Sequence, residues 1–341
     1  MELGTRTIDS VSFLRGAAFE TILCNLCGGT DFRVLAEEDG IGLPVRTVMC
    51  RACGLIAINP RLTKQWYGEY YRYVNAAREH YKHGHENEKQ KLGSGFAAAM
   101  KHGRAFAERL RPYILGGVTI DVGSAEGGLL AGMRDLVGIE PIGIEPTESR
   151  VLFANQKGIR SYACLIEDVE RVVPHLPRAA NIVCTKSLNH LLDPAFFFSW
   201  AHRMLVPDGR LFLEVKNFRQ QCRMSGRVRF GIQIDHPFMF TPETLAAFVR
   251  RAGFTIMHLE VDETKNRSER DLQRRSGLPV GHIRLAAMRT EREPFAEELR
   301  PEPGLVERLS REFSPNALFF HYLLHYANIR ENLARRIGLA R

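Results

Sequence analysis

The sequence predicts an α/β fold whose central sheet is doubly wound, mostly parallel and completed by a late antiparallel hairpin. Over residues 116–290, apolar runs of strand length alternate with helix-like segments, and a glycine-rich turn follows the first run. The last two runs have no obvious helix between them, which favours direct antiparallel pairing. Alternating strands and helices are typical of a parallel sheet that is covered by helices on both faces.

The glycine-rich turn follows the first predicted strand. Residues 118–130 read VTIDVGSAEGGLL, with a β-branched run that ends on Asp121 and a helix-like stretch that begins at Leu129. Glycines let the backbone turn sharply here, and they let a ligand approach the free N–H groups of a helix N-terminus. The turn indicates either a ligand pocket or an ordinary connection, because short glycine motifs also arise by chance.

The second predicted strand, residues 141–145, ends on the carboxylate of Glu145. An acidic side chain about 20 residues beyond a glycine turn can accept hydrogen bonds from ribose hydroxyls. The later strands are expected at residues 161–164, 181–185, 211–215, 254–261 and 282–288, with helices at 148–157 and 241–253.

Four cysteines near the N-terminus form two pairs, Cys24-x2-Cys27 and Cys50-x2-Cys53, and a glycine directly follows each pair. Two-residue spacing lets one tight turn present two sulfur atoms, and four thiolates complete a tetrahedral zinc site. Redox-active or merely buried thiols are the alternatives. Because four protein ligands leave no open position, we expect a structural Zn²⁺ ion.

The remaining segments divide the chain into four predicted parts. After the cysteine pairs comes a tyrosine-rich stretch, WYGEYYRYV, whose aromatic side chains pack between two domains or line a substrate pocket. A helical pattern then fills residues 84–115. The predicted parts are a zinc-binding module at 1–62, an aromatic-rich and helical bridge at 63–115, the α/β core at 116–290, and a C-terminal helical extension at 291–341.

Composition restricts the partners and the compartment. The 341 residues carry a net charge of +8 and are 45% hydrophobic, which indicates a globular protein with a preference for anionic partners. The sequence contains no apolar run of about 18 residues, as a membrane span would need, and its N-terminus does not resemble a signal peptide. We therefore expect a cytoplasmic protein with reduced cysteines and without a transmembrane segment.

Two histidines are candidates for a site, and one of them follows a predicted strand at the edge of the sheet where ligands bind. His190 lies just beyond the strand at 181–185, and His236 precedes the helix at 241–253. Imidazole titrates near neutrality, so either side chain is a candidate general base. The alternative is that they cap helices or pack in the core.

The spacing Asp121-x-Gly123-x-Ala125-x-Gly127, together with the order of strands and the late hairpin, resembles the class I methyltransferases that use S-adenosylmethionine. The resemblance covers residues 118–289 and implies a Rossmann-like methyltransferase core. By this resemblance, the cofactor-binding residues are Asp121, Gly123, Ala125, Gly127, Glu145, Leu165 and Ile166.

The resemblance also assigns roles within this set. The glycine turn shapes the pocket for the methionine portion, Glu145 holds the ribose hydroxyls, and Leu165 and Ile166 flank the adenine. Alanine replaces the middle glycine, and Ala125 should be tolerated there if its φ is negative. Asn181 stands where the family usually has an acid at the start of the fourth strand.

The cysteine pairs, the tyrosine stretch and the histidines together resemble methyltransferases with N-terminal zinc domains. This group includes sugar C-methyltransferases of deoxysugar pathways and relatives linked to surface-polysaccharide synthesis. The resemblance implies a sugar or nucleotide-sugar-linked acceptor, with Tyr71 and Tyr73 in its pocket and His190 and His236 beside it. The chain departs from the group at residues 234–236, Ile-Asp-His in place of His-Glu-His, and we expect its 341 residues to be too few for the group's large C-terminal domain.

The C-terminal part and a group of arginines leave other functions open. Two amphipathic helices are expected at 305–313 and 317–337, docking on the core, on a second subunit or on a membrane surface. Four arginines are candidates to bind an anionic acceptor such as a diphosphate. The alternative is that they form a solvated basic face. They are Arg219, Arg223, Arg227 and Arg229.

Two rival functions remain beside the small-molecule methyltransferase. They are an RNA methyltransferase, favoured by the basic charge and the zinc module, and a non-catalytic scaffold that binds zinc and a nucleotide. We expect no DNA partner.

Overall fold

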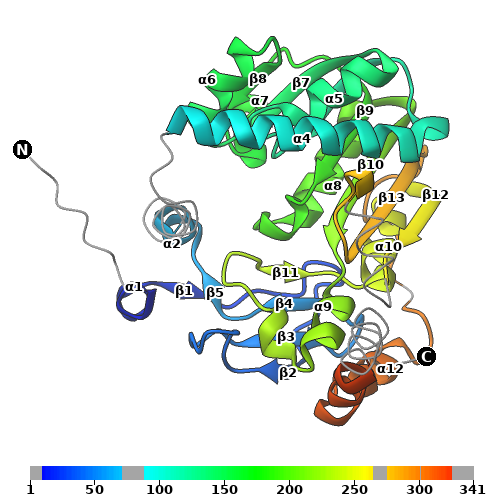
Figure 1. Ribbon diagram of the computed structural model, residues 1–341. Helices are drawn as coiled ribbons and strands as arrows, with labels where there is room; N and C mark the ends of the chain where they lie inside the picture. The colour runs from blue at the N-terminus through cyan, green and yellow to red at the C-terminus, as the bar shows by residue number, and fades with distance from the viewer. Residues whose placement is uncertain (1–9, 71–87, 264–274, 300, 325–341) are drawn as a thin grey trace, which may run out of the picture.

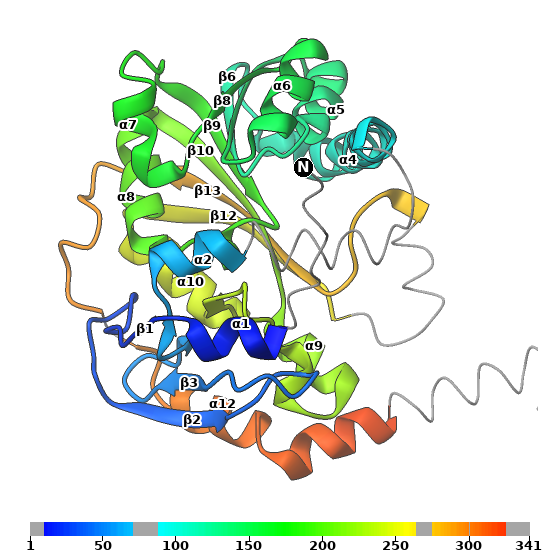
Figure 2. The same cartoon turned by 90° about the vertical axis from the view of Figure 1, so that its left-hand side faces the viewer.

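The computed structural model describes residues 10–70, 88–263, 275–299 and 301–324 (Figure 1). A seven-stranded sheet between two layers of helices forms the larger part of the molecule, and a four-stranded sheet lies beside it (Figures 1 and 2). Tyr71 and Tyr73, two predicted pocket residues, lie outside the described residues.

The seven-stranded sheet has the strand order β12-β13-β10-β9-β6-β7-β8. Its strands are β6 (Gly117–Val122), β7 (Ile139–Glu145), β8 (Arg160–Ala163), β9 (Ala179–Thr185), β10 (Leu205–Lys216), β12 (Phe254–Val261) and β13 (His282–Arg289). The strands from β6 to β10 pair in parallel, whereas β13 is antiparallel to both β10 and β12. The predicted fold class is confirmed, including the antiparallel pairing of the last two strands. The insertion of β13 between β10 and β12 was not predicted, because periodicity indicates strands but not their order.

Helices cover both faces of this sheet (Figure 2). One face carries α4 (Glu88–Leu110), α5 (Gly128–Val137) and α6 (Glu148–Gln156), and the other carries α7 (Val169–Val172), α8 (Pro194–Met204) and α10 (Pro242–Arg251). The backbones of α4 and α5 touch at three glycines. A Cβ atom on Gly103 would lie 2.1 Å from the Leu129 carbonyl oxygen, and one on Gly132 would lie 2.2 Å from that of Met100. The third, Gly128, is the first residue of α5, so α4 fixes the helix that opens directly after the glycine turn.

The N-terminal part forms a separate sheet, and one strand of this sheet comes from the α/β core. It contains α1 (Ser10–Gly16), the pair β1 (Phe19–Glu20) and β5 (Arg61–Leu62), and α2 (Lys64–Glu69). The four-stranded sheet has the order β11-β4-β3-β2, with β2 (Phe32–Ala36), β3 (Thr47–Cys50), β4 (Ile56–Ile58) and β11 (Phe238–Met239). Because β11 follows His236 directly, the cysteine-bearing sheet continues into the segment that carries this histidine.

The first C-terminal helix, α12 (Leu305–Glu312), docks on the cysteine-bearing part of the chain. Leu305 and Leu309 are buried, and a Cβ atom on Gly54 would lie only 2.8 Å from Leu309 Cδ1. The next helix is described over 315–324, where Phe319 and Phe320 are 58% and 60% exposed. None of the described helices is long and apolar enough to cross a membrane.

Three of the four arginines that were candidates for an anion site pair with carboxylates instead. Arg219, in α9 (Phe218–Ser225), is 8% exposed and donates to both carboxylate oxygens of Glu243 at 2.7 Å. It also contacts Glu312 of α12 at 2.7 Å. Arg223 pairs with Glu263, and Arg229 with Glu38. Because carboxylates already neutralise these three cations, they offer no diphosphate site. Arg219 and Arg223 join α9 to neighbouring elements, and Arg219 is too buried to belong to a solvated face.

Candidate functional site

The glycine turn after β6 has the geometry that the sequence predicts for it. Gly123 and Gly127 have φ angles of 80° and 78°, and Gly127 is the N-cap of α5. A Cβ atom on Gly123 would lie 2.1 Å from Ser187 Oγ, so a side chain there would displace the segment after β9. The turn thus brings the ends of β6 and β9 into contact and leaves N–H groups of α5 facing the same edge.

Ala125 does not meet the condition of a negative φ. Its φ is 48°, in the left-handed region, where a Cβ atom approaches the following carbonyl oxygen. The strained residue donates its N–H to Glu145 Oε2 at 3.1 Å. The turn therefore keeps a conformation that suits glycine, although the residue is alanine, and the hydrogen bond helps to hold it.

Glu145 lies at the end of β7 and is held by two backbone N–H groups. Its Oε1 accepts from the Thr147 N–H at 3.1 Å, while its Oε2 accepts from Ala125. The side chain is 5% exposed. Both hydrogen bonds hold the carboxylate at the C-terminal edge of the sheet, beside the glycine turn.

Asp121 is a buried acid, and one of its carboxylate oxygens accepts no hydrogen bond from the described residues. Its Oδ1 atom is inaccessible and has no hydrogen-bond partner among the described residues. Burial raises the pKa of Asp121 to about 8, and the charge of Glu145 adds to the increase. A buried acceptor without a partner usually marks a place where a ligand or water completes the site. A cationic ligand at this edge would favour the ionised form.

The predicted adenine-flanking residues differ in exposure. Leu165 follows β8 and is 40% exposed, whereas Ile166 is 3% exposed and packs in the core. Only the Leu165 side chain is therefore free to cover a bound ring. Asn181 has a structural role: its amide group bonds to Leu115 through both N–H and C=O groups, and to Thr119.

The two histidines meet at the same edge of the sheet, although 46 positions separate their numbers. The rings of His190 and His236 lie edge to face with centroids 4.5 Å apart. His190 Nδ1 lies 2.9 Å from the backbone carbonyl oxygen of Asp235 and 3.9 Å from that residue's Oδ2. Burial lowers the pKa of both rings, and the Asp235 carboxylate opposes the shift at His190. Both rings are therefore neutral near pH 7.

Ligand atoms of His190, Asp235 and His236 all lie within 4.8 Å of one another. Two imidazoles and a carboxylate are a donor set that suits several divalent cations. However, His190 Nδ1 already lies 2.9 Å from the Asp235 carbonyl oxygen, so that nitrogen is engaged. The arrangement suits proton handling better.

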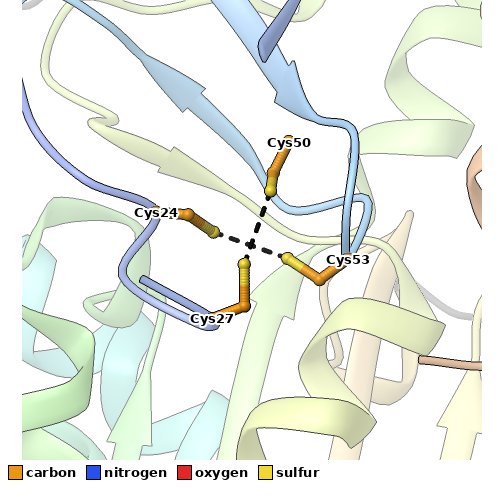
Figure 3. Close-up of side chains that lie close together, drawn as sticks. All are labelled: Cys24, Cys27, Cys50 and Cys53. Carbon is orange, nitrogen blue, oxygen red and sulfur yellow. Dashed lines mark hydrogen bonds between the residues drawn. The ribbon is translucent and has the colours of Figure 1, made fainter. Parts of the chain in front are cut away.

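The four cysteines of the N-terminal part converge from two turns (Figure 3). Cys24 and Cys53 have sulfur atoms 3.4 Å apart, and the sulfur atoms of Cys27 and Cys50 are 3.5 Å apart. All four are free thiols within 4.8 Å of one another. Sulfur ligands of a tetrahedral zinc ion lie about 3.8 Å apart, so the donor set and the spacing fit zinc.

Residues 98–259 match the family model described as "Methyltransferase domain". The match spans the glycine turn, Glu145 and both histidines. Over these residues the chain carries a methyltransferase domain.

Solved structures of methyltransferases are similar to this chain at low identity. An S-adenosylmethionine dependent methyltransferase from Mesorhizobium loti is 18% identical, with 54% of this chain and 98% of that chain covered and a TM-score of 0.42. One from Archaeoglobus fulgidus is 16% identical, with 60% and 100% covered and a TM-score of 0.45. The plantazolicin methyltransferase BpumL in complex with SAH is 11% identical, with 61% and 92% covered and a TM-score of 0.42. The search of the curated proteins found no match.

One residue beside the histidines of this methyltransferase domain was not predicted to belong to a site. Tyr67 lies in α2, is 7% exposed, and donates its hydroxyl hydrogen to the backbone carbonyl of Asp235. The sequence places Tyr67 among several tyrosines with no sign of which one reaches the core. The contact depends on how the N-terminal part packs, so the sequence carries no signal for it.

Proposed function

We propose that this protein transfers a methyl group from S-adenosylmethionine to a small, sugar or nucleotide-sugar-linked acceptor. The observation that carries the proposal is the neutral His190, which lies at the same sheet edge as Glu145 and the glycine turn. The sugar acceptor rests on the resemblance to methyltransferases with N-terminal zinc domains. In this assignment Tyr71 and Tyr73 orient the acceptor.

The cofactor supplies a methyl group that its sulfonium centre already activates. Asp121, Gly123, Ala125 and Gly127 would hold its methionine portion, and Glu145 would accept hydrogen bonds from the ribose hydroxyls. Leu165 would cover the adenine, while Ile166 would support Leu165 from the core. The protein's remaining tasks are to align the acceptor and to remove its proton.

His190 is the better base of the two histidines. A backbone carbonyl can only accept a hydrogen bond, so the contact with Asp235 requires the proton on Nδ1 and leaves a lone pair on Nε2. The His190 side chain is 33% exposed, whereas His236 is 3% exposed. His190 Nε2 would therefore take the acceptor proton, and His236 would hold the ring of His190 in place.

Cys24, Cys27, Cys50 and Cys53 would bind one structural Zn²⁺ ion as thiolates. Their sulfur atoms complete the coordination shell, so the ion would stabilise the N-terminal part and take no part in methyl transfer. The division into a zinc module at 1–62, a bridge at 63–115, a core at 116–290 and an extension at 291–341 remains our proposal. So do the cytoplasmic location and homo-oligomerisation through the C-terminal helix.

Calorimetry with S-adenosylmethionine tests the cofactor assignment. We expect saturable binding to the parent protein and binding weakened about 10- to 100-fold in Glu145→Ala, because charge-assisted hydrogen bonds to the ribose are lost. Glu148→Ala removes an exposed acid three residues away and should bind like the parent. Absence of binding to the parent, or unchanged affinity in Glu145→Ala, would contradict the assignment.

Transfer of a radiolabelled methyl group tests the acceptor class. The panel contains nucleotide-sugars, free deoxysugars and transfer RNA, each incubated with the purified full chain and labelled S-adenosylmethionine. Label in a nucleotide-sugar supports the proposal. Label in RNA, with an affinity that falls steeply as salt rises, replaces it with an RNA methyltransferase.

A further inference from the structure

The N-terminal part holds both loops that carry the histidines. The loop after β9 is held by Asn25, whose side chain donates to Asp193 Oδ1 and accepts from the Ala195 N–H, both at 2.9 Å. The loop before β11 is held by Ile58, whose N–H donates to the Pro237 carbonyl at 3.0 Å. The two loops thus depend on residues 25–67 for their positions.

One carbonyl joins these two loops to α2. The backbone oxygen of Asp235 accepts a hydrogen bond from the hydroxyl of Tyr67 and lies 2.9 Å from His190 Nδ1. A carbonyl oxygen has two lone pairs, so both donors can be satisfied at once. Asp235 is 8% exposed and Tyr67 is 7% exposed, which keeps water from replacing either bond.

The Asp235 carboxylate does not offer the same hydrogen bond. Its Oδ2 lies 3.9 Å from His190 Nδ1, beyond hydrogen-bonding distance. The backbone carbonyl therefore sets the His190 tautomer, and the position of that carbonyl decides where Nε2 points.

We propose that Tyr67 is a positioning residue: through the Asp235 carbonyl it holds His190 in the Nδ1–H tautomer with Nε2 directed at the acceptor. The inference rests on the proposed role of His190 as base. The N-terminal part would then contribute to catalysis as well as bind zinc, because Tyr67 of α2 acts on His190 through the Asp235 carbonyl. Tyr67 itself touches neither the cofactor nor the reacting atoms.

The test uses the full chain labelled with [¹⁵N]histidine and long-range ¹H–¹⁵N spectra, which distinguish a protonated ring nitrogen from one with a lone pair. His190→Gln assigns the His190 signals. We expect the parent protein to show His190 as the Nδ1–H tautomer, and Tyr67→Phe to shift it toward the Nε2–H form. Tyr113→Phe removes a hydroxyl from a ring that packs against His258, and it should leave the His190 tautomer unchanged.

Two outcomes would overturn the proposal. The first is an Nε2–H tautomer in the parent, which needs no variant and decides the question even if Tyr67→Phe fails to fold. The second is an unchanged tautomer in a Tyr67→Phe protein that keeps its zinc and its affinity for S-adenosylmethionine.

With the acceptor from the methyl-transfer screen, we expect Tyr67→Phe to lower kcat about 10- to 100-fold with little change in KM, since a misplaced base affects only the transition state. An unchanged kcat in Tyr67→Phe together with a large loss in His190→Gln would refute the positioning role and leave the proposed function intact. A parent protein that binds no S-adenosylmethionine would instead refute the proposed function, whatever the tautomer.

Discussion

The site has a cofactor end, around Glu145 and the glycine turn, and a histidine end, around His190 and His236. Contacts between residues near in sequence hold the first, whereas contacts between residues far apart in sequence hold the second. At the cofactor end, Glu145 accepts from the N–H groups of Ala125 and Thr147, which are 20 and 2 residues away in sequence. At the histidine end, Asp235 receives the Tyr67 hydroxyl across 168 residues, and Asn25 reaches Asp193 across 168 residues as well. The cofactor end is therefore a local product of two strands and their turns. The histidine end exists only after the N-terminal part has docked.

Because different contacts hold the two ends, we expect that damage to one end leaves the structure of the other end in place. Damage to the cysteine-bearing part should disturb the histidines and leave the glycine turn in place. Damage to the glycine turn at positions other than Gly123, which touches Ser187, should abolish cofactor binding and leave the histidine loops intact. Four measurements can test this separation.

The largest effect is expected from Cys50→Ser. Losing one of four thiolates should lower bound zinc from near one ion per chain to almost none, because structural zinc contributes about 10–16 kcal/mol of apparent binding free energy. Methyl transfer should then be lost, while any soluble variant still binds S-adenosylmethionine. Metal analysis and calorimetry measure the two responses.

Cys222→Ser is the matched control, since Cys222 is a fully buried free cysteine outside the cluster. It should retain zinc. Zinc at full stoichiometry in Cys50→Ser would contradict the zinc assignment. Equal loss of cofactor binding and methyl transfer would contradict the independence of the two ends.

His190→Gln should lower methyl transfer about 100- to 10,000-fold with unchanged cofactor affinity, the usual range for a lost general base. In the parent, burial lowers the His190 pKa below its ordinary value of 6.5, opposed by Asp235 and Glu145 and reinforced by Lys216. The neutral form is active, so the rate should be flat near pH 7 and fall only as the pH drops through the lowered pKa. A rate that begins to fall above pH 7 would argue against His190 as the base.

Cofactor affinity should depend on pH through Asp121, by up to about tenfold per unit of pH. Its pKa of about 8 means that the carboxyl group is protonated at pH 7. A bound cationic cofactor favours the carboxylate, so binding should release a proton and tighten as the pH rises toward 8. Calorimetry in buffers of different ionisation enthalpy counts the protons. Asp121→Asn should remove the dependence, and a pH dependence that survives in this variant would rule out Asp121 as its source.

The smallest effect is expected from Ala125→Gly. Glycine accepts a φ of 48° without a Cβ clash, so the variant should gain about 1 kcal/mol in free energy of unfolding. Thermal unfolding monitored by circular dichroism measures the change. Ala131→Gly, within α5, provides the opposite control and should lose about 1 kcal/mol. A destabilised Ala125→Gly protein would mean that the alanine methyl group makes a contact worth more than the strain.

The strands and the turn at the C-terminal edge of the sheet can be predicted because their signals are local. The strand that contains Asp121, the turn and the position of Glu145 at the end of β7 all follow from short patterns of residue type. The left-handed φ of Ala125 could not be predicted, since alanine ordinarily avoids this region and only the hydrogen bond to Glu145 reveals why it stays there.

The histidine end could be predicted only in part. His190 and His236 were candidates because each follows or precedes a predicted element at the ligand-binding edge. Their contact, and the role of Tyr67, depend on the pairing of β11 with β4, which brings together residues about 180 positions apart. Three of the four arginines show the same limit, because nothing near them in sequence reveals the carboxylates that pair with them, those of Glu38, Glu243, Glu263 and Glu312.

Because Gly54 packs closely against Leu309, the docking of α12 should depend on whether the four cysteines hold zinc. The turn that presents Cys53 has no room for a side chain beneath α12, so any rearrangement of that turn must displace the helix. Chelation of zinc should consequently release α12 and expose it to protease. A proteolytic cut near residue 305 would then serve as a readout of zinc occupancy, visible on a gel without any substrate.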